Sequence, residues 1–261
     1  MRSIIALFLA LIVANFAMAH GSHGAHGGDD SGLSVGLGFG MHIHQEEDET
    51  EFIPNAELSL SYNESFFDDK LDFDIGVSYI PTFTKGFFEI AEDYPFSNQD
   101  FYQQVICLNA GLAYRIDLTY FTSLSFVLEN DTDFYLAPRE DGENNIEGEL
   151  TPGIKFNWKS GIGDIYVQYG VPLQYVSYFK EEEFGVGSDV TIGWESKFGL
   201  GINFTGHFLM SPESGFDGVD AVISYVLPIK KFSLYVNCEF EGIGSDEGMH
   251  IVPAIGIRYS F

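Results

Sequence analysis

Basic residues and cysteines are scarce in this chain. Its 261 residues include 12 Lys and Arg against 39 Asp and Glu, which gives a formal net charge of −27 at pH 7. Such a chain repels phosphates, so we expect neither nucleic acid nor anionic lipid headgroups as ligands. The two cysteines, Cys107 and Cys238, fall on different predicted strands and on opposite faces. We therefore predict free thiols and no disulfide framework.

Long apolar runs are missing after the N-terminus. Residues 1–19 have the three parts of a secretory signal peptide: a basic start at Arg2, an apolar stretch over 4–13 and small residues before the cleavage site at 17–19. The alternative, a membrane-anchor helix, needs a longer run than the one that Asn15 interrupts. We expect an exported protein with a flexible Gly/His-rich tail over 20–32 and one folded domain over 33–261.

The whole chain is 45% hydrophobic. Within the predicted domain, apolar residues alternate with small and polar ones. Alternation predicts β-strands, because successive side chains of a strand point to opposite faces. It recurs about twelve times. The predicted strands cover residues 33–44, 52–62, 71–83, 105–116, 119–129, 149–158, 165–175, 190–194, 198–208, 219–227, 232–240 and 250–261.

Two all-β architectures fit this alternation: a secreted β-sandwich and a membrane β-barrel. Three features favour the barrel. Long acidic connections alternate with short turns, the apolar face carries no charge in this register, and its aromatic residues gather near the short turns. These aromatics are Tyr62, Tyr114, Tyr120, Trp158, Phe198, Tyr225, Phe232, Tyr259 and Phe261. We predict a transmembrane antiparallel up-and-down β-barrel of about 12 strands (10–14), with both termini periplasmic.

The last predicted strand, HIVPAIGIRYSF, carries Gly256, a penultimate aromatic at Tyr259 and a terminal Phe261. This strand resembles the C-terminal insertion signal of bacterial outer-membrane β-barrel proteins, the porin-like superfamily. The resemblance implies that the last strand pairs with the first and is read by the barrel-assembly machinery. It also implies that the protein lies in the outer membrane of a Gram-negative-type bacterium. There the barrel would contact outer-membrane lipid, and its loops would be extracellular.

The face opposite the apolar one is small and polar, with an excess of acids. Its predicted acids are Glu57, Asp72, Asp74, Glu129, Glu149, Asp164, Asp189, Glu195, Asp220, Glu239 and Glu241, and its bases are Lys70, Arg115, Lys155, Lys159 and Arg258. Fixed carboxylates around a pore favour cations. We predict a narrow cation-preferring channel for small cationic or neutral solutes. The alternative is a closed, surface-exposed barrel whose acidic loops make it a structural, adhesive or divalent-metal-binding protein.

Catalytic patterns are missing from this face. His207 lies there, but no Ser stands two positions away and no nucleophile-and-base pair is in register. We therefore predict no enzymatic activity, no catalytic residue and no required cofactor.

One histidine group has the spacing of a metal site. His42 and His44 lie about 6.6 Å apart on one face of a strand, and barrel closure brings the last strand, with His250, to the same rim. With Glu57 and Glu241 these residues form a candidate zinc or copper site. His20, His23 and His26 of the tail form a second, flexible candidate. In both cases the alternative is a set of solvated polar residues.

Overall fold

A computed structural model of the protein describes residues 32–45, 50–83, 101–136, 146–177, 182–211, 214–244 and 249–261. The predicted signal peptide, residues 1–19, lies outside these ranges, as do the tail histidines. Within the described ranges, no helix has the length and apolar character needed to cross a membrane.

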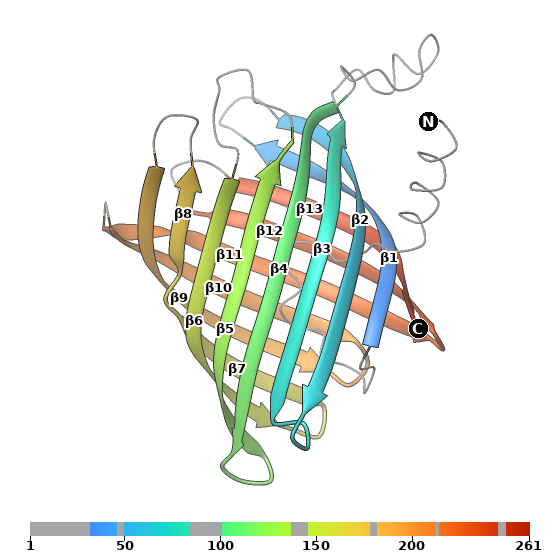
Figure 1. Ribbon diagram of the computed structural model, residues 1–261, viewed down its shortest axis with the longest axis vertical. Coiled ribbons are helices and arrows are strands. Elements are labelled where there is room, and N and C mark those ends of the chain that lie inside the picture. The colour runs from blue at the N-terminus through green and yellow to red at the C-terminus, as the bar shows by residue number, and fades with distance from the viewer. Residues whose placement is uncertain are drawn as a thin grey trace.

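The described residues form one antiparallel sheet of thirteen strands (Figure 1). The strands are β1 (Gly32–Gln45), β2 (Thr50–Phe66), β3 (Leu71–Phe83), β4 (Phe101–Asp117), β5 (Thr122–Tyr135), β6 (Ile146–Lys159), β7 (Gly163–Gly170), β8 (Leu173–Ser177), β9 (Glu182–Ser196), β10 (Leu200–Ser211), β11 (Gly215–Ile229), β12 (Phe232–Ile243) and β13 (Met249–Ser260). Strands that adjoin in sequence pair along the wall, as in an up-and-down barrel.

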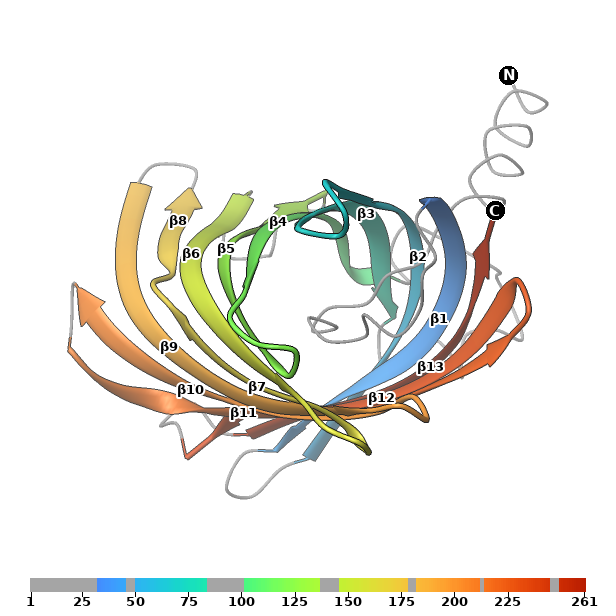
Figure 2. The same ribbon diagram turned by 90° about the horizontal axis from the view of Figure 1, so that it is seen from below.

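The sheet closes on itself. β13 pairs with β1, from Ser34 opposite Ser260 to Gln45 opposite Met249, and β9 pairs with β10. β7 and β8 both lie between β6 and β9, so they are two parts of one barrel strand. The predicted barrel of about twelve strands is therefore confirmed. Figure 2 shows the curved wall with β1 and β13 side by side.

A proline divides the predicted strand 165–175. Val171 and Pro172 separate β7 from β8, because Pro172 has no N–H to donate to the β-ladder. The neighbouring backbone remains satisfied: Val171 N donates to Pro152 O at 3.0 Å and Gly187 N donates to Pro172 O at 2.9 Å. The wall therefore continues past the break without losing its closure.

The two ends of the barrel differ. We call one end the short-turn rim and the other end the loop rim. The short-turn rim carries Gly32, Ser260 and the connections 67–70, 118–121, 160–162, 197–199 and 230–231. Most strands extend further toward the loop rim than predicted. The largest error is the strand expected at 190–194, which is β9, Glu182–Ser196. The long loops are therefore fewer than expected, with 84–100 and 136–145 the longest connections.

Hydroxyl groups fix three of the short turns. Thr119 Oγ1 accepts hydrogen bonds from Phe121 N and Thr122 N, both at 3.1 Å. Ser160 Oγ and Ser196 Oγ accept backbone N–H groups of their own turns in the same way. A side chain that bonds local backbone competes with the β-ladder. This explains why β5 and β10 begin after the predicted residues 119 and 198.

The outward face is apolar and exposed, from Leu37 and Phe39 on β1 to Ile255 and Ile257 on β13. Eight of the nine predicted rim aromatics are exposed, and Tyr259 packs between Phe232 and Phe261 with ring centroids 4.9 Å from each. One prediction needs correction. Because β2 continues past residue 62, Glu64 joins the outward face at the short-turn rim, where Tyr62 donates to it at 2.8 Å.

An aromatic ring from β12 lies across the closing seam between β13 and β1. Tyr235 is 7% exposed, and its ring occupies the space that a Cβ at Gly256 would need. Its hydroxyl group lies 2.5 Å from the Cβ position of Gly38, the residue opposite Gly256 on β1. The glycine of the predicted insertion signal thus makes room for a side chain that packs over both closing strands.

This contact predicts that Gly256→Val destabilises the barrel. The added side chain displaces the Tyr235 ring, and overpacking of this kind costs about 1–3 kcal/mol. Gly161→Val is the matched control, because a Cβ at Gly161 meets no atom within 4 Å. Urea unfolding in detergent, followed by tryptophan fluorescence, measures both variants. Equal unfolding midpoints would contradict the role of the seam.

Candidate functional site: the barrel lumen

The lumen wall combines closely packed and solvent-reaching parts. Six inward serines are among the buried residues, and Ser34 Oγ lies 2.7 Å from Ser61 Oγ across β1 and β2; the six are Ser34, Ser59, Ser61, Ser78, Ser123 and Ser125. On the same face, Asp74 of β3 is exposed. Since Asp74 belongs to an inward row, opposite Asn63 and Gly111, its exposure is to the lumen. Solvent therefore reaches part of the interior.

Two cations lie over tyrosine rings on opposite walls. Lys155 Nζ of β6 is 4.0 Å from the ring centroid of Tyr166, and Arg258 Cζ of β13 is 6.0 Å from that of Tyr235. Both rings are nearly buried, at 4% and 7% exposed. β6 and β13 are six strands apart in either direction around the wall. Ring faces attract cations, so each tyrosine holds its cation against the wall.

Carboxylates flank both pairs. Lys155 interacts electrostatically with Glu195 and Glu129, and Arg258 does so with Glu57. Gln168 Nε2 donates to Glu129 Oε2 at 2.9 Å, which ties β5 to β7. Neighbouring carboxylates therefore balance much of the positive charge of Lys155 and Arg258.

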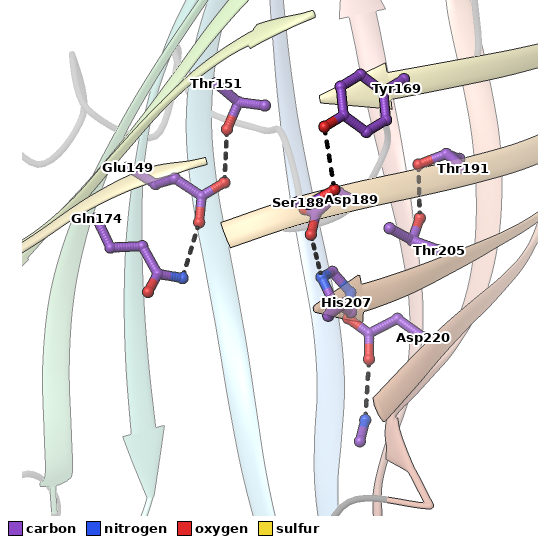
Figure 3. Close-up of polar contacts among 11 residues, drawn as sticks. Glu149, Thr151, Tyr169, Gln174, Ser188, Asp189, Thr191, Thr205, His207 and Asp220 are labelled. Carbon is purple, nitrogen blue, oxygen red and sulfur yellow. Dashed lines mark hydrogen bonds and ion pairs between the residues drawn. The ribbon is translucent and has the colours of Figure 1, made fainter. Parts of the chain in front are cut away.

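In the half of the barrel nearer the loop rim, called the loop half, β5 and β6 carry acidic residues directly opposite each other. Asp131 lies opposite Glu149, and Asp133 lies opposite Glu147. Glu149 accepts hydrogen bonds from Thr151 Oγ1 at 2.7 Å and Gln174 Nε2 at 3.2 Å (Figure 3). Like charges directly opposite on neighbouring strands are destabilising. The opposition of Asp131 and Glu149 is therefore expected to cost stability in the folded barrel.

His207 of β10 lies between two aspartates. Its Nδ1 is 3.1 Å from Asp189 Oδ1 on β9, and its Nε2 is 3.0 Å from Asp220 Oδ2 on β11 (Figure 3). Gly242 N of β12 donates to the other oxygen of Asp220 at 2.9 Å. The set joins four strands next to the bulges that interrupt pairing at His207/Phe208 and Val219/Ala221. Because both ring nitrogens have aspartate partners, the His207 side chain links β9, β10 and β11.

The structure places the predicted lumen charges as follows. Asp72 accepts from Ser65 Oγ at 2.7 Å, and Arg115 Nε is 3.2 Å from Asp117 Oδ1. Asp164 lies opposite Lys159 on one side and Glu195 on the other. Lys70, predicted on the inward face, lies instead in the turn 67–70. Asp131, Asp133 and Glu147 were missed because they were assigned to a loop, although they continue the alternation of Glu129 and Glu149.

The predicted histidine site is brought together in part. His44 lies directly opposite His250 across the closing seam, and Glu241 lies opposite His250 on the other side of β13. Glu57 is not in this row. It lies opposite Gly38, six residues along from Glu51, which is the residue opposite His44. Glu57 is seven residues from the start of β2 at Thr50, too far along the strand to belong to the rim.

Comparisons with known proteins support the fold. No protein-family model matches the chain, and no curated protein matches it. Solved structures do match. The NanC porin has a TM-score of 0.54 at 9% sequence identity, over 88% of this chain and 100% of that one. An outer membrane channel from Pseudomonas putida F1 has a TM-score of 0.53 at 10% identity, over 94% and 100%.

The translocator domain of the autotransporter NalP from Neisseria meningitidis has a TM-score of 0.54 at 10% identity, covering 100% of this chain and 97% of that domain. These likenesses concern the fold. The chain has the closed, antiparallel β-barrel architecture of outer-membrane proteins.

The opposed acids of β5 and β6 predict that Asp131→Asn stabilises the barrel. Removing one charge relieves the repulsion with Glu149, which gains about 0.2–1 kcal/mol. Asp117→Asn is the contrasting variant, because it breaks the ion pair with Arg115 and gains nothing. Urea midpoints in detergent measure both variants. A lower midpoint for Asp131→Asn would show that its charge is compensated in the folded barrel.

Proposed function

We propose that this protein is an outer-membrane channel that prefers small cationic solutes and also admits neutral ones. The observation that carries the proposal is the distribution of charge along the barrel axis. Among the described residues, every Lys and Arg lies in a short turn or in the short-turn half of a strand: Lys70, Arg115, Lys155, Lys159, Lys197, Lys230, Lys231 and Arg258.

The loop half of the lumen is acidic. Its described inward acids include Asp131, Asp133, Glu147, Glu149, Asp220, Glu239 and Glu241. A cleft lined by charge of one sign concentrates counter-ions at its mouth and speeds their entry. The loop half therefore attracts cations. The short-turn half carries charges of both signs, and the cations continue through it.

Three further observations support a channel. A barrel of twelve strands is wider than the eight-stranded barrels that side chains fill. Asp74 and Lys159 are exposed on the inward face, so water reaches the interior. Two of the proteins that share this fold are described as a porin and an outer membrane channel. His207, whose two ring nitrogens are engaged by aspartates, offers no base for a nucleophile, which favours a non-enzymatic role.

The outer face fits outer-membrane lipid. An apolar band with aromatic residues at the short-turn rim matches the hydrocarbon layer and its interface. Both ends of the barrel domain lie at that rim, which we assign to the periplasm, with the loops outside. Gly256, Tyr259 and Phe261 are the residues through which the assembly machinery would recognise the last strand.

Channel activity predicts cation-selective conductance in planar bilayers. The combined variant Asp131→Asn, Glu147→Gln and Glu149→Gln lowers the cation-to-anion permeability ratio, because it neutralises acids at the mouth. Asp68→Asn with Asp69→Asn is the matched control. Both residues lie in a short turn with φ of 56° and 58°, a left-handed conformation that Asn also tolerates. Anion preference, or no conductance, would overturn the proposal.

Membrane assembly predicts that the protein fractionates with the outer membrane and migrates differently on gels before and after heating. Removing Phe261 lowers the assembled fraction, since it takes away one of the two aromatic partners of Tyr259. Recovery of full-length protein from the soluble periplasmic fraction would contradict membrane residence.

A further inference from the structure

Two neighbouring hairpins carry basic residues at the short-turn rim. The connection 197–199 joins β9 to β10, and the connection 230–231 joins β11 to β12. β10 pairs with β11, and Val226 N donates to Gly199 O at 2.8 Å, so the two hairpins are bonded to each other at this rim. Their turns contain three exposed basic residues, Lys197, Lys230 and Lys231.

These two turns contain no acid, although the chain as a whole is strongly acidic. Residues 196–212 and 221–238 include no Asp or Glu. Bases elsewhere at this rim have acids beside them: Lys70 shares its turn with Asp68 and Asp69, Arg115 contacts Asp117 at 3.2 Å, and Lys159 lies opposite Asp164. We call the sector of the rim defined by Lys197, Lys230 and Lys231 the basic sector.

The side chain of Lys231 lies on the lipid-facing side of the wall. Its Nζ is 5.8 Å from the ring centroid of Tyr259, which packs between Phe232 and Phe261 on the outward face. In the neighbouring turn, Phe198 is 79% exposed. A lysine beside interfacial aromatics lays its stem along apolar surface and keeps its ammonium group at the level of the lipid headgroups.

Lys230 has a backbone conformation that lysine does not favour. Ile229 pairs with Phe232, which leaves a two-residue turn, and Lys230 has a φ of 59° in this turn. The left-handed region is unfavourable for a residue with a Cβ, and Gly and Asn are the residues that such turns prefer. Local backbone energy therefore favours Gly or Asn, and what lysine adds at this position is its charge.

We propose that the basic sector binds the phosphate groups of anionic phospholipids in the membrane leaflet at the short-turn rim. The net charge of the whole chain predicts repulsion of such lipids, but the acids of the loop half lie at the other end of the barrel. Salt screens exposed charges over about 10 Å, so headgroups at this rim respond to the nearby lysines. The exposed aromatics of the same turns favour a bilayer over a soluble phosphate as the partner.

The test uses a natural reporter. The chain has two tryptophans, Trp158 and Trp194, and both lie opposite Ile165 near the short-turn rim. Trp158→Phe leaves Trp194, three residues before Lys197, as the only fluorophore of its kind. This parent, as the full mature protein, is reconstituted in phosphatidylcholine vesicles that contain increasing amounts of brominated phosphatidylglycerol. Bromine quenches tryptophan where the lipid touches the protein.

We expect the parent to prefer phosphatidylglycerol over phosphatidylcholine by about fivefold at low salt, since one basic residue near an anionic surface contributes about that factor. High salt removes the preference because the charges are exposed. Replacing the basic sector by Lys197→Gln, Lys230→Asn and Lys231→Gln abolishes it, whereas Arg at all three positions retains it. Lys159→Gln is the matched control, because Lys159 is close to the reporter but lies opposite Asp164 on the inward face.

Lys230→Asn alone separates binding from folding. Asn tolerates the left-handed conformation, so the urea midpoint in detergent stays equal or rises while the lipid preference weakens. A lower midpoint with unchanged preference would show that Lys230 serves the fold and would overturn its place in the site. Each variant is first checked for assembly by its heat-dependent gel migration.

Equal quenching by the two lipids in the parent overturns the site, as does an unchanged preference in the triple variant or an equal loss in Lys159→Gln. Displacement of the lipid by inorganic phosphate at matched ionic strength would identify a soluble-phosphate site and overturn the lipid assignment. The proposal rests on membrane residence and not on conduction. Lipid preference without conductance supports the site and refutes the channel, and conductance without lipid preference does the reverse.

Discussion

Pairing of β1 with β13 is the constraint on which the rest of this structure depends. A membrane offers no water to the backbone N–H and C=O groups of an edge strand, so a spanning sheet must close. Closure explains several features that otherwise look unrelated: Gly38 and Gly256 on the seam, the Tyr235 ring packed over both, and the backbone contacts that continue past Pro172. It also brings the two ends of the barrel sequence to one rim.

The interior departs from what stability favours. Asp131 and Glu149 face each other, and so do Asp133 and Glu147, whereas Lys155 and Arg258 stand in the other half against tyrosine rings. A sequence selected for folding alone would interleave these charges. Their separation along the axis produces a directional field, which is consistent with the cation-preferring channel that we propose.

Alternation predicted the barrel, its approximate strand number and the outward aromatics, because a lipid-facing strand has to be apolar at every second position. Strand ends were predicted less well, for identifiable reasons. Hydroxyl groups of Thr119 and Ser196 hold turns that include residues predicted as strand, and Pro172 divides a strand within an unbroken pattern. Strands also continue through acidic residues such as Asp131, beyond the stretch where strand was predicted. The Tyr166–Gly193 and Tyr235–Gly256 contacts depend on cross-strand register, which alternation does not determine.

The register at the seam has a consequence for biogenesis. Gly38 lies near the start of the barrel sequence and Gly256 near its end, so they become neighbours only when the last hydrogen-bonded ladder has formed. An incompletely inserted chain holds the same residues but keeps the two strands apart. The Tyr235 ring can pack over both glycines only in a finished barrel, and the energy of that contact then adds to the energy that keeps the cylinder shut.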